Sequence, residues 1–286
     1  MFGILNLYKP SGITSRDAVS NISNRIRRTK IGHAGTLDPL ADGVLLLAFG
    51  QATRLISYVQ DLPKEYEARF RFGIESDTQD IEGKCVSKEL NPISREDIES
   101  ALARFTGTIE QVPPAYSAIK IGGKRSYDLA RAGKAVELKA RQVNVHSLAL
   151  THFDFPDFGL RIECGKGTYV RTLGVDLARS LANVCVMTGL TRTAVGHFRH
   201  ENAIRGEDFL AGRWVESLQS PTEALSGWES VVLSPNQQLD AINGNRPKLE
   251  AKTDQVLGVD EQGNLKAILE RSSGNEFRFL INFMGR

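Results

Sequence analysis

The sequence GHAGTLDPLADG (residues 32–43) is followed directly by the apolar run VLLLAFG (residues 44–50). This run is too short for a helix and too apolar for a surface, so it predicts a central strand of a sheet. The stretch before it is rich in glycine and predicts a loop that leads into the strand. Asp38 stands in this loop between Leu37 and Pro39, and the proline keeps the Asp38 backbone out of the helical region. The carboxylate is therefore expected in a fixed, extended conformation.

The Asp38 carboxylate needs a cation if it is to stay ionised in such a loop. A desolvated carboxylate tends to be protonated unless a positive charge lies close to it. Arg171 is the candidate, because it opens a predicted helix after the glycine-flanked turn of GTYVRTLG (residues 167–174). The sequence therefore predicts an acid-centred site. The alternative is that Asp38 and Thr36 only shape a turn, as Asp and Thr often do.

Strand and helix patterns alternate along the rest of the chain. Strands are expected at residues 2–8, 65–74, 141–150 and 159–165. Helices are expected at residues 15–28 with Ser15 as N-cap, at 52–60, at 94–105 with Ser94 as N-cap and Asp97 completing a capping box, and after the turn at 167–169. The pattern loosens between residues 220 and 235. Residues 256–283 then alternate apolar and polar side chains between Gly and Asn turns, which predicts a small β domain that packs against the rest.

Composition excludes several classes of protein. The chain has 286 residues, of which 41% are hydrophobic, so it can bury a large core. It contains no run of about eighteen apolar residues, which argues against a membrane span, and the early Lys9 and Pro10 argue against a signal peptide. Its three cysteines are far apart and its histidines do not cluster, so neither a disulfide framework nor a zinc site is indicated. A reducing cytoplasm fits best.

Cofactor motifs are incomplete in this sequence. The segment GKGT (residues 165–168) resembles the end of a phosphate-binding loop, but Leu160 stands where that motif needs a glycine, and Lys166 is followed by Gly167 where it needs Ser or Thr. The segment DTQDIEG (residues 77–83) resembles a calcium loop until its third ligand position, which is Ile81. No Gly-x-Gly-x-x-Gly opens a helix after a strand. We therefore expect no cofactor and no metal.

Positive charge is concentrated in the first part of the chain. Residues 1–60 contain seven Lys or Arg and three Asp, whereas residues 207–286 contain eight basic and twelve acidic residues. The segment NRIRRTK (residues 24–30) suits a phosphate backbone, although it can also be read as the solvated end of a helix. Residues 112–134 read as a long functional loop with a short helix. Basic residues and tyrosines alternate there, namely Tyr116, Lys120, Lys124, Arg125, Tyr127, Arg131 and Lys134.

Four ordered segments resemble the motifs of one family. GHAGTLDPLADGVLLLAFGQATR (residues 32–54) closely resembles the signature of bacterial tRNA pseudouridine synthases of the TruB type. KEYEARFRFGIESDTQDIEG (residues 64–83), QVPPAYSAIKIGGKRSYDLARAG (residues 111–133) and GTYVRTLGVDLA (residues 167–178) resemble the following motifs in the same order, and LTRTAVGHF (residues 190–198) also fits the family pattern. The resemblance runs from about residue 2 to residue 200, and four ordered motifs are more specific than any one of them.

The resemblance implies a fold and an activity. The fold would be α+β, with a large mixed, mainly antiparallel sheet flanked by helices in a catalytic domain of residues 1–230. Residues 231–286 would form a short PUA-like β domain, whose acidic balance weakens the expectation that it binds phosphates. The activity would be isomerisation of the T-loop uridine at tRNA position 55 to pseudouridine by an aspartate nucleophile acting on a flipped-out base, without cofactor.

The resemblance also assigns roles by position. Asp38 would be the nucleophile, Arg171 its ion-pair partner, and Tyr66 the residue that stacks on the target base and takes part in proton transfer. Leu190 would line the apolar pocket and His33 would hold the flipped-out RNA. The RNA-contacting segment would supply Lys120, Lys124, Arg125, Tyr127 and Arg131. Plain structural readings stay open, with Tyr66 a strand aromatic, Leu190 ordinary core and His33 a loop histidine.

The expected partner is the T-stem-loop of tRNA. The protein is expected to act as a monomer, without a guide RNA and without a membrane. Guide-RNA-dependent relatives carry long extra termini that this sequence lacks. A second hypothesis is a tRNA-binding and refolding protein, or RNA chaperone, which is compatible with catalysis. A third is a metal-dependent nuclease that would use Asp38, Asp42, Asp77 and Asp80, and whose carboxylates would have to converge on a cation.

Overall fold

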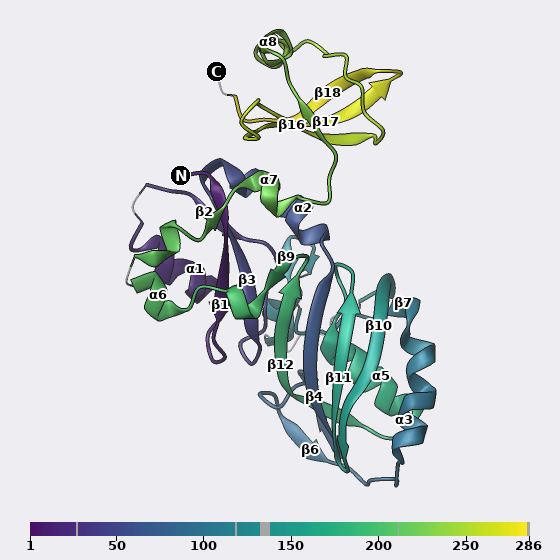
Figure 1. Cartoon of the computed structure of the whole chain (residues 1–286). Helices are drawn as coiled ribbons and strands as arrows, with labels where there is room; N and C mark the ends of the chain where they lie inside the picture. The colour runs from purple at the N-terminus through teal and green to yellow at the C-terminus, as the bar shows by residue number, and fades with distance from the viewer. Residues whose placement is uncertain (27, 118, 132–137, 211, 285–286) are drawn as a thin grey trace.

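A large, mainly antiparallel sheet organises the chain (Figure 1). The computed structural model describes residues 1–26, 28–117, 119–131, 138–210 and 212–284. The strands run in the order β14-β1-β3-β12-β4-β11-β10-β7, with β2 paired to β3 and β13 to β12. Their bounds are β1 (Gly3–Lys9), β2 (Ile31–His33), β3 (Asp42–Phe49), β4 (Lys64–Phe72), β7 (Gly107–Gln111), β10 (Arg141–Asp154), β11 (Asp157–Cys164), β12 (Cys185–Val195), β13 (Phe198–Arg199) and β14 (Leu218–Gln219). The β3–β12 pair is parallel. The expected fold class, a large mixed and mainly antiparallel sheet with helices, is confirmed.

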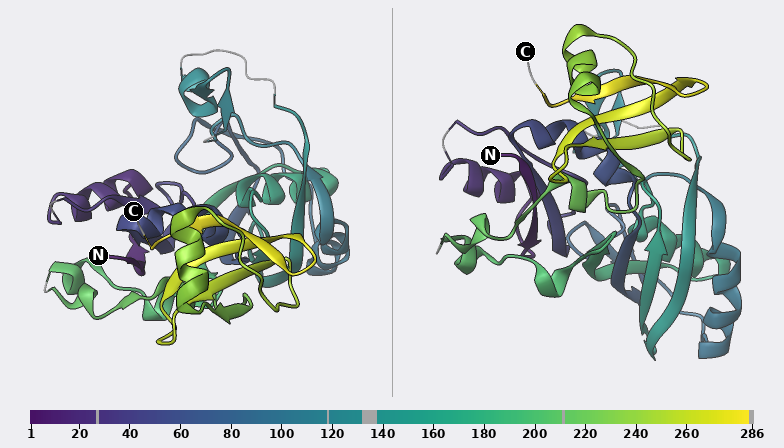
Figure 2. Two further views of the ribbon diagram at one scale, coloured as in Figure 1. Left: turned by 90° about the horizontal axis from the view of Figure 1, so that it is seen from above. Right: turned by 45° about the horizontal axis from the view of Figure 1, so that its top comes forward.

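Most of the helices lie along this large sheet, and two short hairpins extend from it (Figure 1). The α-helices are α1 (Ser15–Ser23), α2 (Ile56–Asp61), α3 (Arg95–Leu102), α4 (Ser126–Arg131), α5 (Val170–Ser180), α6 (Gly206–Leu210), α7 (Pro221–Ala224) and α8 (Pro235–Asn243). Of these, α8 lies at the C-terminal sheet and α4 in a projecting segment (Figure 1 and Figure 2). The hairpins pair β5 (Ile74–Ser76) with β6 (Cys85–Ser87), and β8 (Lys120–Ile121) with β9 (Lys124–Arg125). The left view of Figure 2 shows the segment with β8, β9 and α4, in teal, projecting from the body of the molecule.

The apolar run that precedes residue 50 is the predicted central strand. In β3, Val44 and Leu46 pack into one hydrophobic cluster, and Leu45 and Leu47 pack into another. Successive side chains of a strand point to opposite faces, so both faces of β3 are covered by protein. A strand buried on both faces needs no polar alternation, which explains the continuous run of apolar letters.

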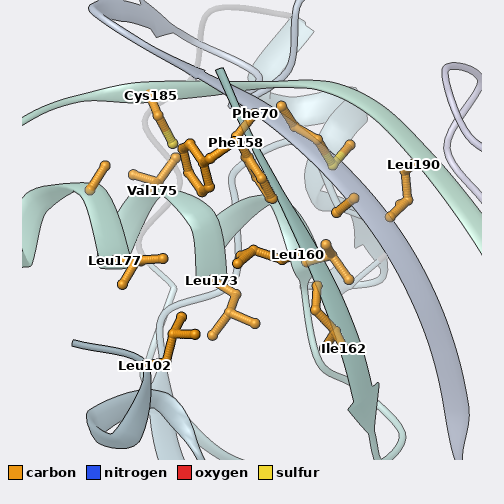
Figure 3. Packing of buried hydrophobic residues seen from close by; sticks show 14 of the residues in the cluster. Phe70, Leu102, Phe158, Leu160, Ile162, Leu173, Val175, Leu177, Cys185 and Leu190 are labelled. Atoms are coloured by element: carbon orange, nitrogen blue, oxygen red, sulfur yellow. The ribbon is translucent and has the colours of Figure 1, made fainter. Parts of the chain in front are cut away.

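Helix α5 lies against the strands that carry much of the main core (Figure 3). Leu173 and Leu177 of α5 pack with Phe70 of β4 and Leu160 of β11 in one cluster. Gly174 permits this close approach, because a Cβ atom at this position would lie 2.1 Å from Cε1 of Phe70. The helix is therefore held against the sheet just one turn after Arg171.

The four-stranded C-terminal sheet has its own core and also contacts the large sheet. Its strands run β15 (Ser230–Val232), β16 (Gln255–Val259), β17 (Leu265–Ser273) and β18 (Glu276–Asn282). Leu257 and Ile268 share a hydrophobic cluster with Ile4 of β1. The rings of Tyr58 and Trp228 meet edge to face with centroids 5.3 Å apart. The small β unit expected from the alternating pattern is present and packs against the rest, as Figure 1 shows.

The first helix differs from its prediction. Helix α1 ends at Ser23 rather than at residue 28, and its N-cap is Thr14 rather than Ser15. Thr14 and Asp17 form a reciprocal capping box. The hydroxyl of Ser15 instead accepts a hydrogen bond from the Leu37 amide (2.8 Å) and donates one to the Leu37 carbonyl (3.1 Å). Thr14 caps the helix because the Ser15 hydroxyl is hydrogen-bonded to Leu37 in the loop that carries Asp38.

Of two other local predictions, one is confirmed and one is only partly correct. The capping box of Ser94 and Asp97 is present at the start of α3, as predicted. The helix expected at residues 52–60 divides into a 3-10 helix (Gly50–Leu55) and α2. Within the described ranges, no helix is both long and apolar enough to cross a membrane.

Candidate active site

Asp38 and Arg171 form an ion pair with two contacts across the molecule. Nε of Arg171 lies 2.9 Å from Oδ2 of Asp38, and Nη2 donates to Oδ1 at 3.1 Å. Asp38 lies in the loop between β2 and β3, whereas Arg171 lies in the first turn of α5. A guanidinium that contacts both oxygens of a carboxylate, here with one hydrogen bond and one close ion contact, fixes both the distance and the orientation of that carboxylate.

The Arg171 side chain is only 5% exposed, and oxygen atoms surround its guanidinium on several sides. Nη1 donates to the carbonyl of Thr78 at 2.6 Å and lies 3.4 Å from Oδ2 of Asp80. Nη2 also donates to the carbonyl of Tyr116 at 3.1 Å. Together with the contacts to Asp38, these contacts engage all three nitrogens of the guanidinium. Arg171 therefore connects the Asp38 loop, the 77–83 loop and the start of the projecting segment.

Hydrogen bonds from Lys9 and Gly12 to backbone carbonyls hold the Asp38 loop in place. Nζ of Lys9, a fully buried side chain, donates to the carbonyls of Pro10 (2.9 Å), Ile13 (2.7 Å) and Pro39 (3.4 Å). The amide of Gly12 also donates to the Pro39 carbonyl, at 2.9 Å. The residue that follows Asp38 is thus bonded to the end of β1 and the turn after it.

Burial and three nearby charged groups, Arg171, Asp80 and Lys9, shift the pKa of the Asp38 carboxyl. Burial raises the pKa of the Asp38 carboxyl, the Arg171 guanidinium opposes this, and the nearby Asp80 carboxylate raises the pKa further. The net direction is upward. One guanidinium serves two carboxylates here, so Arg171 offsets the burial of Asp38 only in part. The side chain is 35% exposed, which leaves the carboxylate a route to a substrate.

Tyr66 and Leu190 pack in the hydrophobic cluster that also contains Leu37 of the Asp38 loop. Leu37 and Leu190 are members of the main hydrophobic cluster, and the half-buried Tyr66 packs against it. Tyr66 is on β4 and Leu190 is on β12, which are neighbouring antiparallel strands. Burial raises the pKa of Tyr66, and the Arg192 guanidinium opposes this.

The remaining predicted residues fall into two groups, those whose side chains the structure describes and those whose side chains it does not. His33 ends β2, opposite Leu47 of β3, and is half-buried. Tyr127 is half-buried in α4, where its amide donates to the Ser117 carbonyl at 3.1 Å. The backbones of the basic residues lie in β8, β9 and α4, but the side chains of Lys120, Lys124, Arg125 and Arg131 and the whole of Lys134 lie outside the described part.

The arrangement includes residues that sequence reasoning did not select for this role. Asp80 contacts Arg171, Lys9 supports the loop, and Arg192 lies opposite Tyr66. The carbonyls of Thr78 and Tyr116 leave no signal in a sequence, because every residue has one. Asp80 and Arg192 stand inside the quoted family motifs, which was the available signal.

The four carboxylates of the nuclease hypothesis do not form one cluster. Asp38 and Asp80 both lie at Arg171, whereas Oδ1 of Asp77 accepts a hydrogen bond from the Lys84 amide. Across the residues that the structure describes, no group of three or more His, Cys, Asp or Glu side chains could hold a metal ion. The geometry therefore supports an acid with a cationic partner rather than a set of metal ligands.

Comparisons with known proteins agree on one family. Residues 23–170 match the family model described as TruB family pseudouridylate synthase (N terminal domain). A Clostridium novyi protein named tRNA pseudouridine synthase B is 40% identical over 246 residues, which cover 86% of this chain and 85% of that one. A protein of the same name from Oceanobacillus iheyensis is 36% identical over 288 residues, covering 96% and 95%.

A solved structure supports the fold. A chain in the crystal structure of a Cbf5-Nop10-Gar1 complex superposes with a TM-score of 0.78, covering 100% of this chain and 86% of that one. Its sequence is 23% identical, so this similarity bears on the fold alone.

Proposed function

The chain belongs to the TruB family of pseudouridylate synthases and is a tRNA pseudouridine synthase, an isomerase, and on this premise we propose that its substrate is the T-loop uridine at tRNA position 55. The observation that carries the proposal is the ion pair of Asp38 and Arg171, next to the hydrophobic cluster that contains Leu37 and Leu190 and against which Tyr66 packs. The site brings together a carboxylate, a fixed cation and the aromatic ring of Tyr66. All three residues lie in the segments that resemble the family motifs.

The proposed reaction needs one nucleophile and no redox step. The N1–C1′ bond of uridine breaks, the uracil turns, and C1′ joins C5, while C5 loses a proton and N1 gains one. The ionised Asp38 is the nucleophile, which attacks either the ribose or the base. Arg171 keeps the carboxylate aimed through its two contacts, and its contacts with Thr78 and Tyr116 prevent it from turning away. No cofactor is required by this chemistry.

The other residues would hold the detached uracil and the RNA. Tyr66 stacks on the target base and Leu190 closes the apolar side of the pocket, so that the free base stays near the ribose. Flipping the uridine out of the T-loop costs a few kcal/mol, which such contacts offset. His33 and the basic segment with Lys120, Lys124, Arg125, Tyr127 and Arg131 would hold the flipped-out RNA.

We extend the proposal to the organisation of the protein. Residues 1–230 form the catalytic domain and residues 231–286 a short PUA-like domain. The enzyme acts as a monomer in the cytoplasm, without a guide RNA. The named relatives at 36–40% identity are bacterial, which supports this extension.

The decisive experiment uses purified protein and an unmodified tRNA transcript with tritium at C5 of its uridines, in EDTA, followed by mapping of the modified base. We expect tritium release confined to the T-loop uridine. Asp38→Asn should abolish release and leave tRNA binding largely intact, whereas the exposed Asp154→Asn should behave like the parent protein. Full activity of Asp38→Asn would refute the mechanism. Tight tRNA binding and refolding without release would instead support the chaperone hypothesis.

A further inference from the structure

Arg192 is one of the largest fully buried side chains of the molecule, at 2% exposure. It lies on β12, and its Nε donates to the carbonyl of Val44 on β3 at 2.7 Å. Its Nη2 donates to the carbonyl of Gly35 in the nucleophile loop at 3.2 Å. The guanidinium is therefore fixed by two backbone acceptors, one on each side of Asp38 in the chain.

Tyr66 faces this fixed guanidinium from the neighbouring strand. Arg192 and Tyr66 are directly paired in the register of β12 and β4. Arg192 favours the phenolate form of Tyr66 both by its charge and as a hydrogen-bond donor. Cys164 of β11 and Asp38 of the loop act in the opposite direction, and burial raises the pKa of Tyr66. Removing Arg192 would therefore raise that pKa further.

Within the described part of the chain, the Arg192 guanidinium forms no ion pair with a carboxylate. Its acceptors are neutral carbonyls, and the nearest cation on β4, Lys64, also donates to carbonyls, those of Gln60 and Leu62. A buried cation is costly unless an anion or several hydrogen bonds compensate it. A phenolate at Tyr66 would provide such an anion during the reaction.

We propose that Arg192 is a positioning residue that prepares the Tyr66 oxygen to take the proton from C5 of the uracil. The inference rests on the proposed function and concerns its last step. Once C1′ is bonded to C5, the C5–H bond breaks, its electron pair restores the C5–C6 double bond, and the proton goes to the Tyr66 phenolate. Tyr66 has first lost its own proton to water, and N1 takes one from water, so protons balance.

The test is a double-mutant cycle measured by single-turnover tritium release between pH 6 and 9. Arg192→Met should slow tritium release about 10-fold to 100-fold at pH 7. The difference in rate between this variant and the parent protein should become smaller as the pH rises. Arg192→Lys keeps a charge and should recover part of the rate. In a Tyr66→Phe background, Arg192→Met should cost less than about threefold, because the group on which it acts is gone.

Folding and binding controls separate this role from a structural one. Each variant is checked by urea denaturation and by its Kd for tRNA, and if Arg192→Met does not fold, Arg192→Lys is taken through the same cycle. Equal costs with and without the Tyr66 hydroxyl, or a loss independent of pH, would overturn the inference and leave the isomerase assignment intact. Absence of tritium release from the parent protein would instead remove both proposals.

Discussion

The Asp38 carboxylate meets the Arg171 guanidinium through two contacts, Oδ2 to Nε at 2.9 Å and Oδ1 to Nη2 at 3.1 Å. The two residues come from elements 133 positions apart in the chain. The pair therefore exists only when the loop before β3 and the first turn of α5 are both in place.

Replacing Arg171 by lysine tests whether the geometry of this pair matters beyond its charge. Lysine keeps a cation but cannot contact both oxygens of Asp38 while also serving the carbonyls of Thr78 and Tyr116. We expect Arg171→Lys to reduce the single-turnover rate about 100-fold with a small change in Kd for tRNA. Arg95→Lys, on the exposed pair with Glu99, is the matched control. Near-normal activity of Arg171→Lys would show that charge alone suffices.

The acidic side of the pH–rate profile reports on Asp38. Its pKa is raised by burial, lowered by Arg171 and raised by Asp80, with a net upward direction. In the proposed mechanism Asp38 acts in its ionised form, so we expect the rate to fall as the pH drops through this raised pKa, above the ordinary value of about 3.9. Asp80→Asn removes one negative charge and should move this limb to lower pH. A limb that stays in place, or moves upward, would contradict the electrostatic role of Asp80.

Gly174→Ala should loosen the contact between α5 and the sheet. The added Cβ would lie 2.1 Å from Cε1 of Phe70, inside a packed core. We expect the free energy of unfolding to fall by about 1–3 kcal/mol in urea denaturation, and activity to fall because Arg171 moves with the helix. Gly206→Ala is the control, since its Cβ would meet nothing within 4 Å. Parent-like stability in both variants would refute the packing argument.

Lys9→Met should destabilise the protein through the loop that carries Asp38. The substitution leaves three carbonyls, those of Pro10, Ile13 and Pro39, without the Nζ donor. The Pro39 carbonyl still accepts the hydrogen bond of the Gly12 amide, so the loss falls mainly on the carbonyls of Pro10 and Ile13. Each lost hydrogen bond costs about 0.5–1.5 kcal/mol, and less where water takes its place. Urea denaturation is the measurement, and the exposed Lys30→Met is the control. Equal stability of the two variants would show that the three bonds contribute nothing net.

Sequence reasoning succeeded where a local pattern has one physical solution. The apolar run before residue 50 predicted a central strand, and the Ser94 and Asp97 pair predicted the start of a helix; the structure contains both. The contact of Asp38 with Arg171 was inferred because a desolvated carboxylate needs a cation and few arginines follow a glycine-flanked turn. The structure contains that contact.

Sequence reasoning failed where a side chain has a distant partner. Ser15 has the composition of an N-cap, but its hydroxyl is bonded to Leu37, so Thr14 caps the helix. Asp80 was considered only as a metal ligand, because nothing local shows that it shares Arg171 with Asp38. Interactions with backbone carbonyls, such as those of Lys9, depend on how the chain turns and are invisible in the letters.

The distance along the chain between the two ion-pair partners also governs when the site appears during synthesis. A ribosome delivers the chain from its N-terminus, and early segments begin to fold before later ones exist. A nascent polypeptide that already contains the Asp38 loop lacks the Arg171 guanidinium, and its strand β3 has no parallel neighbour until Thr191 and Arg192 of β12 follow. The ion pair can therefore form only after synthesis has passed Arg171, and a chain that stops before this residue lacks the pair.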